Sequence, residues 1–150
     1  MMKKVLFISC LFAITSCKTS LKQDDIIQIN YGTSFGNCRG YCVHNTSITK
    51  EWTVKMDKTW ADSIRNPTKY DSTKTERSFW DTLMAKYEQS NFSQLGEKIG
   101  CPDCTDRGAE WLEIVRNNGL KKKITFDYYA DMGKLNPLLD AIDPLRKENR

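Results

Sequence analysis

The stretch that decides the fold is Phe35–Cys42, FGNCRGYC, which places two cysteines and two glycines in one short segment. A second cysteine pair follows at Cys101 and Cys104, in the sequence CPDC. Strand-like segments begin or end at both pairs, so the bonds of these sulfur atoms decide how strand ends are held. The residue types allow a disulfide-stapled scaffold, a thiolate metal site or a redox centre.

The N-terminal segment indicates where the protein resides. Lys3 and Lys4 precede an apolar run, Val5–Ile14, that is too short to cross a bilayer as a helix. The run has the charge, length and order of a secretory signal peptide. It ends in Ile14-Thr15-Ser16-Cys17, which resembles the lipobox of bacterial lipoproteins. In that family the signal is removed just before the cysteine, and the cysteine is acylated.

The lipobox resemblance implies three parts of the chain. Residues 1–16 form a lipoprotein signal peptide, residues 17–25 form a polar tether, and residues 26–150 form a single α+β domain. Membrane lipid is then a partner through acylated Cys17, because two or three acyl chains give stable attachment. We expect the protein in the outer membrane, lipid-anchored, with its domain facing the periplasm or the cell surface.

The charge of the exported chain is nearly balanced. Two of the 23 Lys and Arg residues, Lys3 and Lys4, lie in the predicted signal peptide, which leaves 21 basic against 19 acidic side chains. Binding of nucleic acid needs a clustered excess of positive charge, and the runs Lys121–Lys123 and Arg146-Lys147 are short. We therefore expect no nucleic-acid partner, and an envelope protein or a glycan as the partner of the domain.

The hydrophobic pattern predicts an α+β fold, in which an antiparallel sheet built from hairpins carries a central and a C-terminal helix packed on one face. The predicted strands are 26–31, 41–48, 51–56, 109–115 and 120–128, and the predicted helices are 78–88 and one that begins at 136. Residues 57–74 are predicted to be a long loop or an irregular edge, and residues 96–108 are predicted to be a loop. The strongest local signal is Asn117-Asn118-Gly119, which is typical of a tight hairpin turn. Asn136 and Pro137 suit the start of the last helix.

The tryptophans indicate where the core lies. Trp52 and Trp80 fall on apolar faces of their predicted elements, so both are expected in the core. Trp111 lies on the strand face opposite Leu112 and Ile114. Either one of these two faces is available to a partner, or helices cover both.

Few side chains suit catalysis. His44 is the one histidine of the chain, and it is expected to be a surface residue. Asp103, Asp106 and Glu110 do not have the spacing of a calcium loop, so we expect a solvated acidic loop there. No nucleophile elbow and no phosphate-binding loop occurs in the sequence. The sequence predicts no catalytic residue, no cofactor and no bound metal, and therefore no enzyme.

The four cysteines of the domain are expected to form disulfides, because thiols of exported proteins oxidise. Four cysteines allow three connectivities. Two alternatives stay open. One is a thiol-disulfide exchange enzyme that uses Cys101 and Cys104, although such pairs normally begin a helix and Cys104 leads into a strand. The other is a zinc-binding module formed by Cys38, Cys42, Cys101 and Cys104.

The segment Cys38-Arg39-Gly40-Tyr41-Cys42, followed by a strand, is similar to the Cys-x-Gly-x-Cys opening of a family of small Bacteroidetes-type lipoproteins of unknown function. Many members have this pair without an equivalent of Cys101 and Cys104. The resemblance therefore implies local pairing, Cys38 with Cys42 and Cys101 with Cys104. It implies a fold and a location but no reaction, so we expect a membrane-anchored envelope lipoprotein that acts as a binding or structural module.

The lipobox resemblance makes a direct prediction about Cys17. The variant Cys17→Ala removes the sulfur that would be acylated, so it is expected to accumulate as a precursor without lipid. Metabolic labelling with a fatty-acid probe, followed by gel analysis, measures this. Labelling of the variant at the level of the unchanged protein would exclude Cys17 as the anchor.

Overall fold

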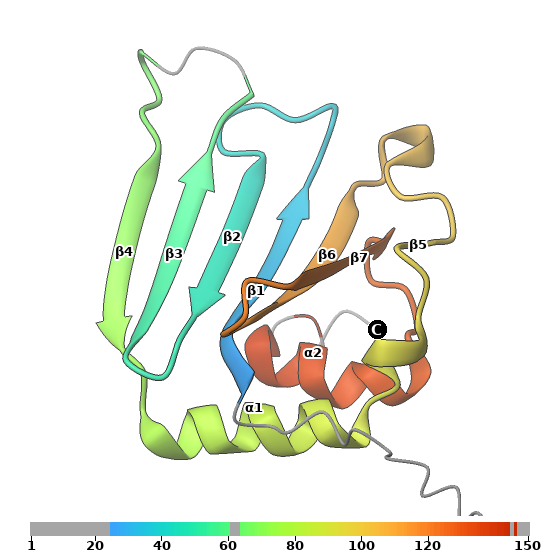
Figure 1. The fold of residues 1–150 in the computed structure, drawn as a ribbon. Helices are drawn as coiled ribbons and strands as arrows, with labels where there is room; N and C mark the ends of the chain where they lie inside the picture. Colours follow the sequence, from blue (N-terminus) through green and yellow to red (C-terminus); the bar gives the residue numbers. More distant parts are fainter. Residues whose placement is uncertain (1–24, 61–63, 145, 147–150) are drawn as a thin grey trace, which may run out of the picture.

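Seven strands form one mostly antiparallel sheet, and two α-helices complete a mixed α+β fold (Figure 1). The structure is a computed structural model that describes residues 25–60, 64–144 and 146; Cys17, the predicted signal peptide and the predicted tether up to residue 24 lie outside it. The strands are β1 (Ile26–Ser34), β2 (Val43–Ile48), β3 (Trp52–Lys58), β4 (Lys69–Lys74), β5 (Lys98–Ile99), β6 (Ala109–Arg116) and β7 (Lys121–Asp127). The helices are α1 (Arg77–Gln89) and α2 (Asn136–Ile142). The predicted α+β class is confirmed.

The sheet has the strand order β4-β3-β2-β1-β6-β7-β5. All neighbouring strands are antiparallel except β5 and β7, which are parallel. The central strand β1 lies between β2 and β6, where Tyr31 is opposite Thr46 on one side and Leu112 on the other. The register therefore brings the segment that follows the first cysteine pair against the middle of the sheet.

One face of the central strands carries the core. Ile29, Tyr31 and Leu112 alternate with polar residues along β1 and β6, and all three are buried. They belong to one buried cluster with residues of both helices, among them Trp80, Leu83, Met84, Leu138 and Leu139. None of the helices in the described part of the chain is long and apolar enough to cross a membrane.

The structure has strands within two segments that the sequence does not predict to be regular strands. Residues 57–74, predicted to be a long loop or an irregular edge, contain the edge strand β4, and residues 96–108, predicted to be a loop, contain β5. Every residue of β4 is exposed, so its sequence has no buried apolar period from which a strand could be predicted. Trp52 was also expected in the core but is 45% exposed, whereas Trp80 is buried as predicted. The exposure of β4 and of Trp52 has one cause, because β3 and β4 extend the sheet beyond the cluster that buries its centre (Figure 1).

Gly32 allows β1 to continue past the point where the sequence predicts its end. A Cβ atom at Gly32 would overlap the indole of Trp111, its register partner on β6. The missing side chain lets Trp111 lie across the strand on the sheet face opposite Leu112. β1 consequently runs on to Ser34 instead of ending at Tyr31.

Proline residues mark the C-terminal helix. Pro137 lies in the first turn of α2, as the sequence predicts. Asn136 is the first helical residue and not the cap, and its side-chain Oδ1 accepts a hydrogen bond from the Met132 N–H at 3.0 Å. The helix ends at Ile142, two residues before Pro144, so the chain leaves α2 near the middle of the sheet.

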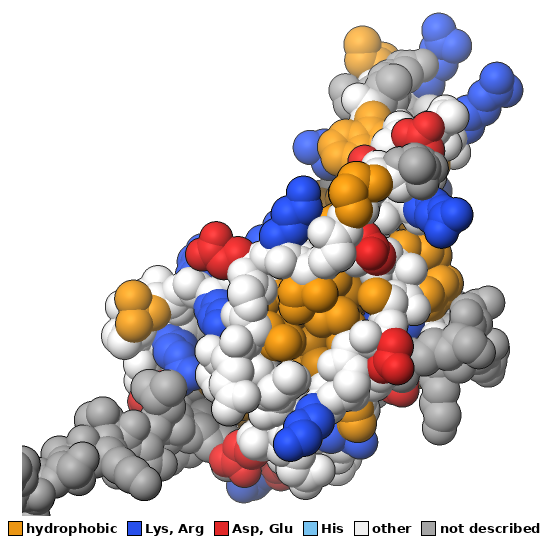
Figure 2. Space-filling model, turned by 90° about the vertical axis from the view of Figure 1, so that its right-hand side faces the viewer, with side chains coloured by type: hydrophobic (Ala, Val, Ile, Leu, Met, Phe, Trp, Pro, Cys, Tyr) orange, Lys and Arg blue, Asp and Glu red, His pale blue; other side chains and the backbone are white. Residues whose placement is uncertain are grey.

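A hollow with a volume of about 1080 Å³ lies at the β5 edge of the sheet. Figure 2 views this side of the molecule and shows hydrophobic side chains gathered at its centre, with charged groups of both signs around them. Two of its lysines already have partners, since Lys122 donates to the Ser93 carbonyl at 2.8 Å and Lys123 lies 4.8 Å from the Trp111 ring.

Gly119 in the β6–β7 turn provides a test of the fold. Its φ is 80°, and a Cβ atom there would meet nothing within 4 Å, so a substitution acts through backbone conformation alone. Gly119→Val is expected to lower the free energy of unfolding by about 1–2 kcal/mol, because a β-branched residue is strained in this region. Chemical denaturation measures the change.

Gly96 is the matched control, because it is exposed, has no positive φ and has space for a side chain. Gly96→Val is expected to change the free energy of unfolding by less than Gly119→Val does. Equal midpoints for the two variants would show that the turn does not need the left-handed conformation.

Candidate functional site

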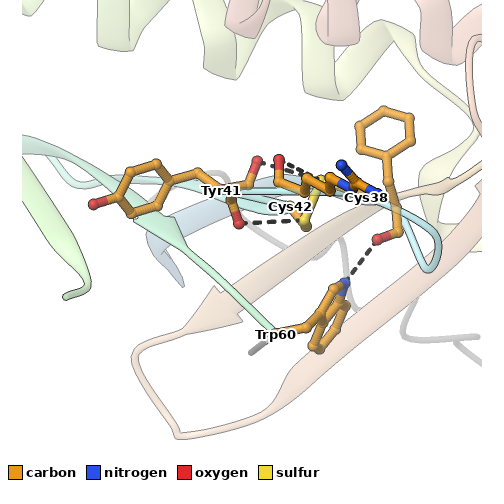
Figure 3. The surroundings of a disulfide bond; sticks show 7 residues. Cys38, Tyr41, Cys42 and Trp60 are labelled. Carbon is orange, nitrogen blue, oxygen red and sulfur yellow. Dashed lines mark hydrogen bonds between the residues drawn. A yellow bond between two sulfur atoms is a disulfide. The ribbon is translucent and has the colours of Figure 1, made fainter. Parts of the chain in front are cut away.

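The four cysteines of the domain form two local pairs at disulfide distance, Cys38 with Cys42 and Cys101 with Cys104. This is the pairing that the family resemblance implies. Figure 3 shows the first of these pairs. The first pair closes the loop between β1 and β2, and the second precedes β6. Both lie beside strand ends, where the sequence placed them.

The first disulfide loop holds Phe35. The Phe35 N–H donates to the Cys42 carbonyl at 3.0 Å, and the indole N–H of Trp60 donates to the Phe35 carbonyl at 2.7 Å (Figure 3). Cys42 is buried and its N–H donates to the Lys58 carbonyl. The loop is therefore tied to both β1 and β3, which fixes the direction of the Phe35 side chain.

The second pair lacks the features of a redox centre. Cys104 begins η3 (Cys104–Asp106), a 3₁₀-helix of three residues, and no α-helix follows it. The Cys101 N–H donates to the carboxylate of Asp127 at 2.9 Å, and a neighbouring negative charge disfavours a thiolate. No three His, Cys, Asp or Glu side chains within the described ranges are grouped so that they could hold a metal ion. This geometry supports neither the exchange enzyme nor the zinc module.

A second feature, which the sequence does not predict, is a groove of about 640 Å³ on the core side of the sheet. We call it the His44 groove. Its floor comes from β1, β2 and β3, and its wall from residues 128–129 and 142–144. Its volume lies within the range of small-molecule sites. The lining residues are Tyr31, Gly32, Thr33, Phe35, His44, Asn45, Thr46, Lys55, Asp57, Tyr128, Tyr129, Ile142, Asp143 and Pro144.

Three polar residues form a row across the floor. Thr33, His44 and Asp57 are register partners on β1, β2 and β3, so their side chains share one face. His44 Nδ1 lies 2.6 Å from Asp57 Oδ1, and the two side chains are 47% and 45% exposed. A carboxylate accepts a hydrogen bond from Nδ1–H, which leaves Nε2 of a neutral ring as an acceptor. The floor therefore has a histidine whose orientation is set.

Aromatic rings form the wall. The ring centroids of Phe35 and Tyr128 lie 4.7 Å apart, and those of Tyr128 and Tyr129 lie 4.0 Å apart. The Tyr31 hydroxyl donates to Asp143 Oδ2 at 3.4 Å. Burial, with the nearby carboxylate of Glu110, raises the pKa of Tyr31 far above its usual range, so this hydroxyl stays neutral and remains a donor. Burial also raises the pKa of Tyr128.

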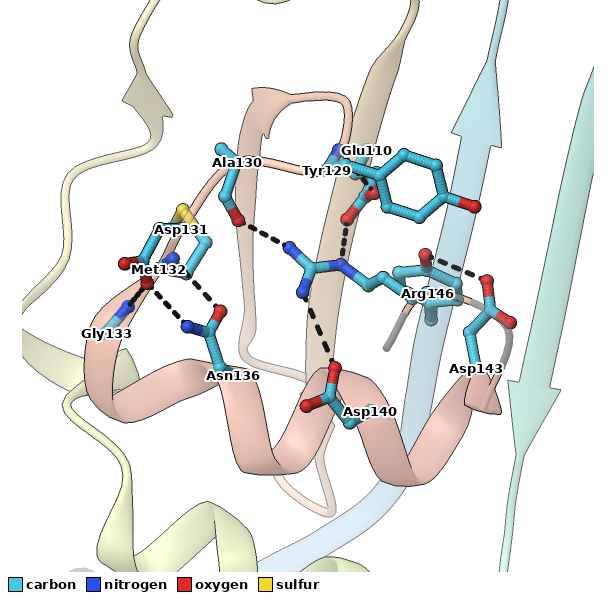
Figure 4. Close-up of polar contacts among 11 residues, drawn as sticks. Glu110, Tyr129, Ala130, Asp131, Met132, Gly133, Asn136, Asp140, Asp143 and Arg146 are labelled. Atoms are coloured by element: carbon cyan, nitrogen blue, oxygen red, sulfur yellow. Dashed lines mark hydrogen bonds and ion pairs between the residues drawn. The ribbon is translucent and has the colours of Figure 1, made fainter. Parts of the chain in front are cut away.

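A buried ion pair lies behind the wall (Figure 4). Arg146 Nε donates to Glu110 Oε2 at 2.7 Å, and both side chains are fully buried. The pair also fixes the turn before α2, because Arg146 Nη2 donates to the Ala130 carbonyl and Glu110 Oε1 accepts the Tyr129 N–H, each at 2.8 Å. Burial raises the pKa of the Glu110 carboxyl, and its hydrogen bonds to Arg146 and to the Tyr129 N–H oppose that rise.

The sequence analysis was wrong about this pair. Glu110 was expected in a solvated acidic loop with Asp103 and Asp106. Its side chain is instead fully buried, while the two aspartates are exposed. Arg146 was counted only as part of a short basic run, and its burial was not predicted. A signal for Glu110 was present, because it lies two residues before Leu112 and four before Ile114 on the same strand. At this spacing it shares their buried face. A buried acid requires a partner.

The ion pair makes a prediction about stability. Arg146→Met leaves Glu110 buried without its cation, so the free energy of unfolding is expected to fall by about 3–5 kcal/mol. The pKa of Glu110 then rises further in the folded variant. Stability should be greatest below the unfolded pKa of about 4.3 and should be lost as pH rises through the folded pKa. Denaturation at several pH values measures both effects.

The double variant Arg146→Met with Glu110→Leu is the control for this prediction. It removes both charges, so it is expected to recover most of the stability and to lack the added loss with rising pH. A single variant as stable as the double variant at every pH would show that the charges do not depend on each other.

Comparison with known proteins does not supply a function for this site. No protein-family model and no curated protein matches the chain. The function has to be inferred from the residues that form the groove.

Proposed function

We propose that this protein is a lipid-anchored lipoprotein of the outer membrane, facing the periplasm or the cell surface, whose domain binds a ligand in the His44 groove. The observation that carries the proposal is the meeting of a fixed polar floor and an aromatic wall. The floor has the His44–Asp57 pair, at 2.6 Å, and the wall has Tyr128 and Tyr129. Sites for small ligands combine apolar walls with a few placed polar groups in this way.

Each part of the groove is held by contacts that do not involve a ligand. The floor is part of a continuous antiparallel ladder. Phe35 is fixed by the first disulfide loop, and Tyr129 is fixed through its N–H bond to Glu110. A site that is ordered before binding loses little conformational entropy when the ligand enters. This rigidity supports a binding role.

The proposal includes a finer arrangement of the layers, in which both helices pack on the same sheet face. Buried residues of α1 and α2 share one cluster with Ile29, Leu112 and Ile114, which point to one side of β1 and β6. The helix layer ends at Ile142, which lines the groove. The groove would then be the uncovered continuation of the face that the helices bury.

The position of the predicted anchor also agrees with a binding role. The described chain begins at Asp25, whose carbonyl accepts the Asn117 N–H at 2.7 Å at one end of β1. Thr33, in the groove, is near the other end, and the strand between Ile26 and Thr33 spans roughly 20 Å. A tether attached at Asp25 would therefore place the groove at the end of the domain that is farther from the anchor.

Site-specific photocrosslinking in cells tests the proposed function. A photoreactive residue at Thr46, which lines the groove, is expected to form an adduct with envelope material in the full-length anchored protein. The matched control is Thr82, which is exposed on α1 and away from the groove. Adduct formation at Thr46 should be at least about tenfold higher than at Thr82, as for a site with a preferred occupant. Equal labelling at both positions, or none at Thr46, would exclude the groove as a binding site.

A further inference from the structure

The charges that line the His44 groove narrow the class of ligand. Among its lining residues, Lys55 is positive, and Asp57 and Asp143 are negative. The Asp57 carboxylate is bonded to His44, and the Asp143 carboxylate accepts the Tyr31 hydroxyl. The charged groups therefore nearly balance, and both acids already have polar partners.

An anionic ligand does not fit this balance. Phosphate and carboxylate ligands are held by clustered Arg and Lys side chains or by backbone N–H groups. The groove contributes one lysine, and two carboxylates would repel such a ligand. A nucleotide or a phosphorylated lipid headgroup would lose more from desolvation than Lys55 could return.

A cationic ligand fits poorly for a different reason. Aromatic rings can hold an ammonium group through their faces, and the wall has several rings. However, Lys55 places a positive charge in the same groove and would repel a cation, and the carboxylates of Asp57 and Asp143 are already hydrogen-bonded to His44 and Tyr31. The groove therefore offers a cation an excess of only one negative charge, and neither carboxylate is free of hydrogen bonds within the protein.

We propose that the ligand of the His44 groove is a neutral saccharide, an inference that rests on the proposed function of the groove. A sugar ring has faces lined by C–H groups and edges lined by hydroxyls. The Tyr128 and Tyr129 rings offer apolar surface for the faces. His44 and the threonines of the floor, Thr33 and Thr46, offer donors and acceptors for the hydroxyls.

The floor also suits hydroxyl groups in its detail. A sugar hydroxyl can donate and accept hydrogen bonds. Nε2 of the neutral His44 ring can accept a hydrogen bond from such a hydroxyl while Nδ1–H donates to Asp57. Thr33 lies opposite His44 in the register, and Thr46 follows two residues later on the same face. Hydroxyls spaced around a ring could therefore bond to neighbouring strands at once, whereas a purely apolar ligand would leave these groups unpaired.

Oligosaccharides that share ring shape and differ in charge test the inference. The probes are oligomers of N-acetylglucosamine, glucose, mannose and galactose, which are neutral, with glucosamine oligomers as cations and hexuronic acid oligomers as anions. The full-length protein is used in a zwitterionic detergent without sugar headgroups. Calorimetry is expected to show binding of at least one neutral oligomer, with an affinity at least about tenfold higher than for its charged counterparts.

Variants of the chain show whether that binding occurs in the groove. Tyr129→Ala is expected to weaken binding about tenfold, which is roughly one lost aromatic contact of 1.4 kcal/mol, and Tyr129→Phe should retain most of it because the ring remains. His44→Ala is expected to weaken binding to a similar degree. The matched control is Tyr70→Ala, since Tyr70 is 70% exposed on β4 and does not line the groove; its affinity should not change.

The outcomes separate this inference from the proposed function. Binding of charged oligomers in preference to neutral ones, or of none of the neutral oligomers, would overturn the saccharide inference. So would neutral binding that Tyr129→Ala and His44→Ala leave unchanged while circular dichroism shows both folded. A Thr46 crosslink to a protein, together with no saccharide binding, would leave the proposed function in place and reject the saccharide. Neither crosslink nor saccharide binding would reject both.

Discussion

The arrangement of the groove depends on the buried ion pair between Glu110 and Arg146, whose atoms Oε2 and Nε lie 2.7 Å apart. Removing two charges from water is costly, and apolar residues of similar volume are often as stabilising as a buried pair. The pair therefore has little value as a source of net stability. Its value is positional, because it joins β6 to the turn at Ala130 and to the segment after α2. Those two segments form the groove wall, and the pair acts together with the Tyr31–Asp143 hydrogen bond and the Phe35–Tyr128 ring contact to hold that wall against the floor.

The disulfide loops have a related role at the same end of the sheet. Each closes a short ring, and short rings constrain the unfolded chain less than long ones, so their contribution to global stability is modest. The two loops also approach each other, since a Cβ atom at Gly36 would lie 3.0 Å from Asp103 Oδ2. The first loop sets the position of Phe35, which packs edge-on against Tyr128. The first loop therefore fixes the Phe35 side of the groove wall, and the ion pair fixes the Tyr129 side.

Sequence patterns predicted the elements that bury side chains, and they were weak where nothing is buried. The hairpin of β6 and β7, the two helices and Trp80 follow from apolar periodicity, whereas β4 is exposed along its length and gives no period. The groove could not be predicted, because its residues are far apart in sequence and meet only through the β1–β2–β3 register and the turn at Tyr129. Glu110 is the exception. Its spacing of two residues from Leu112 predicts that it lies on the buried face, but its partner Arg146 comes from a segment whose position depends on the tertiary fold.

Of the two strands that extend the sheet beyond the core, β3 contributes lining residues to the groove, whereas no lining residue comes from β4. These strands bury little, leaving Trp52 and Tyr70 45% and 70% exposed, so hydrophobic burial alone gives no reason to keep them. They are held by their ladders and by local contacts, such as the bond from the Tyr41 hydroxyl to the Pro67 carbonyl at 3.0 Å. What β3 adds is the carboxylate of Asp57, without which His44 would have no partner to set its orientation. A sheet without β3 would keep the buried cluster but would lack Lys55 and Asp57 in the groove. The strand therefore buries little apolar surface, and it contributes Asp57, the residue that orients His44 in the candidate site.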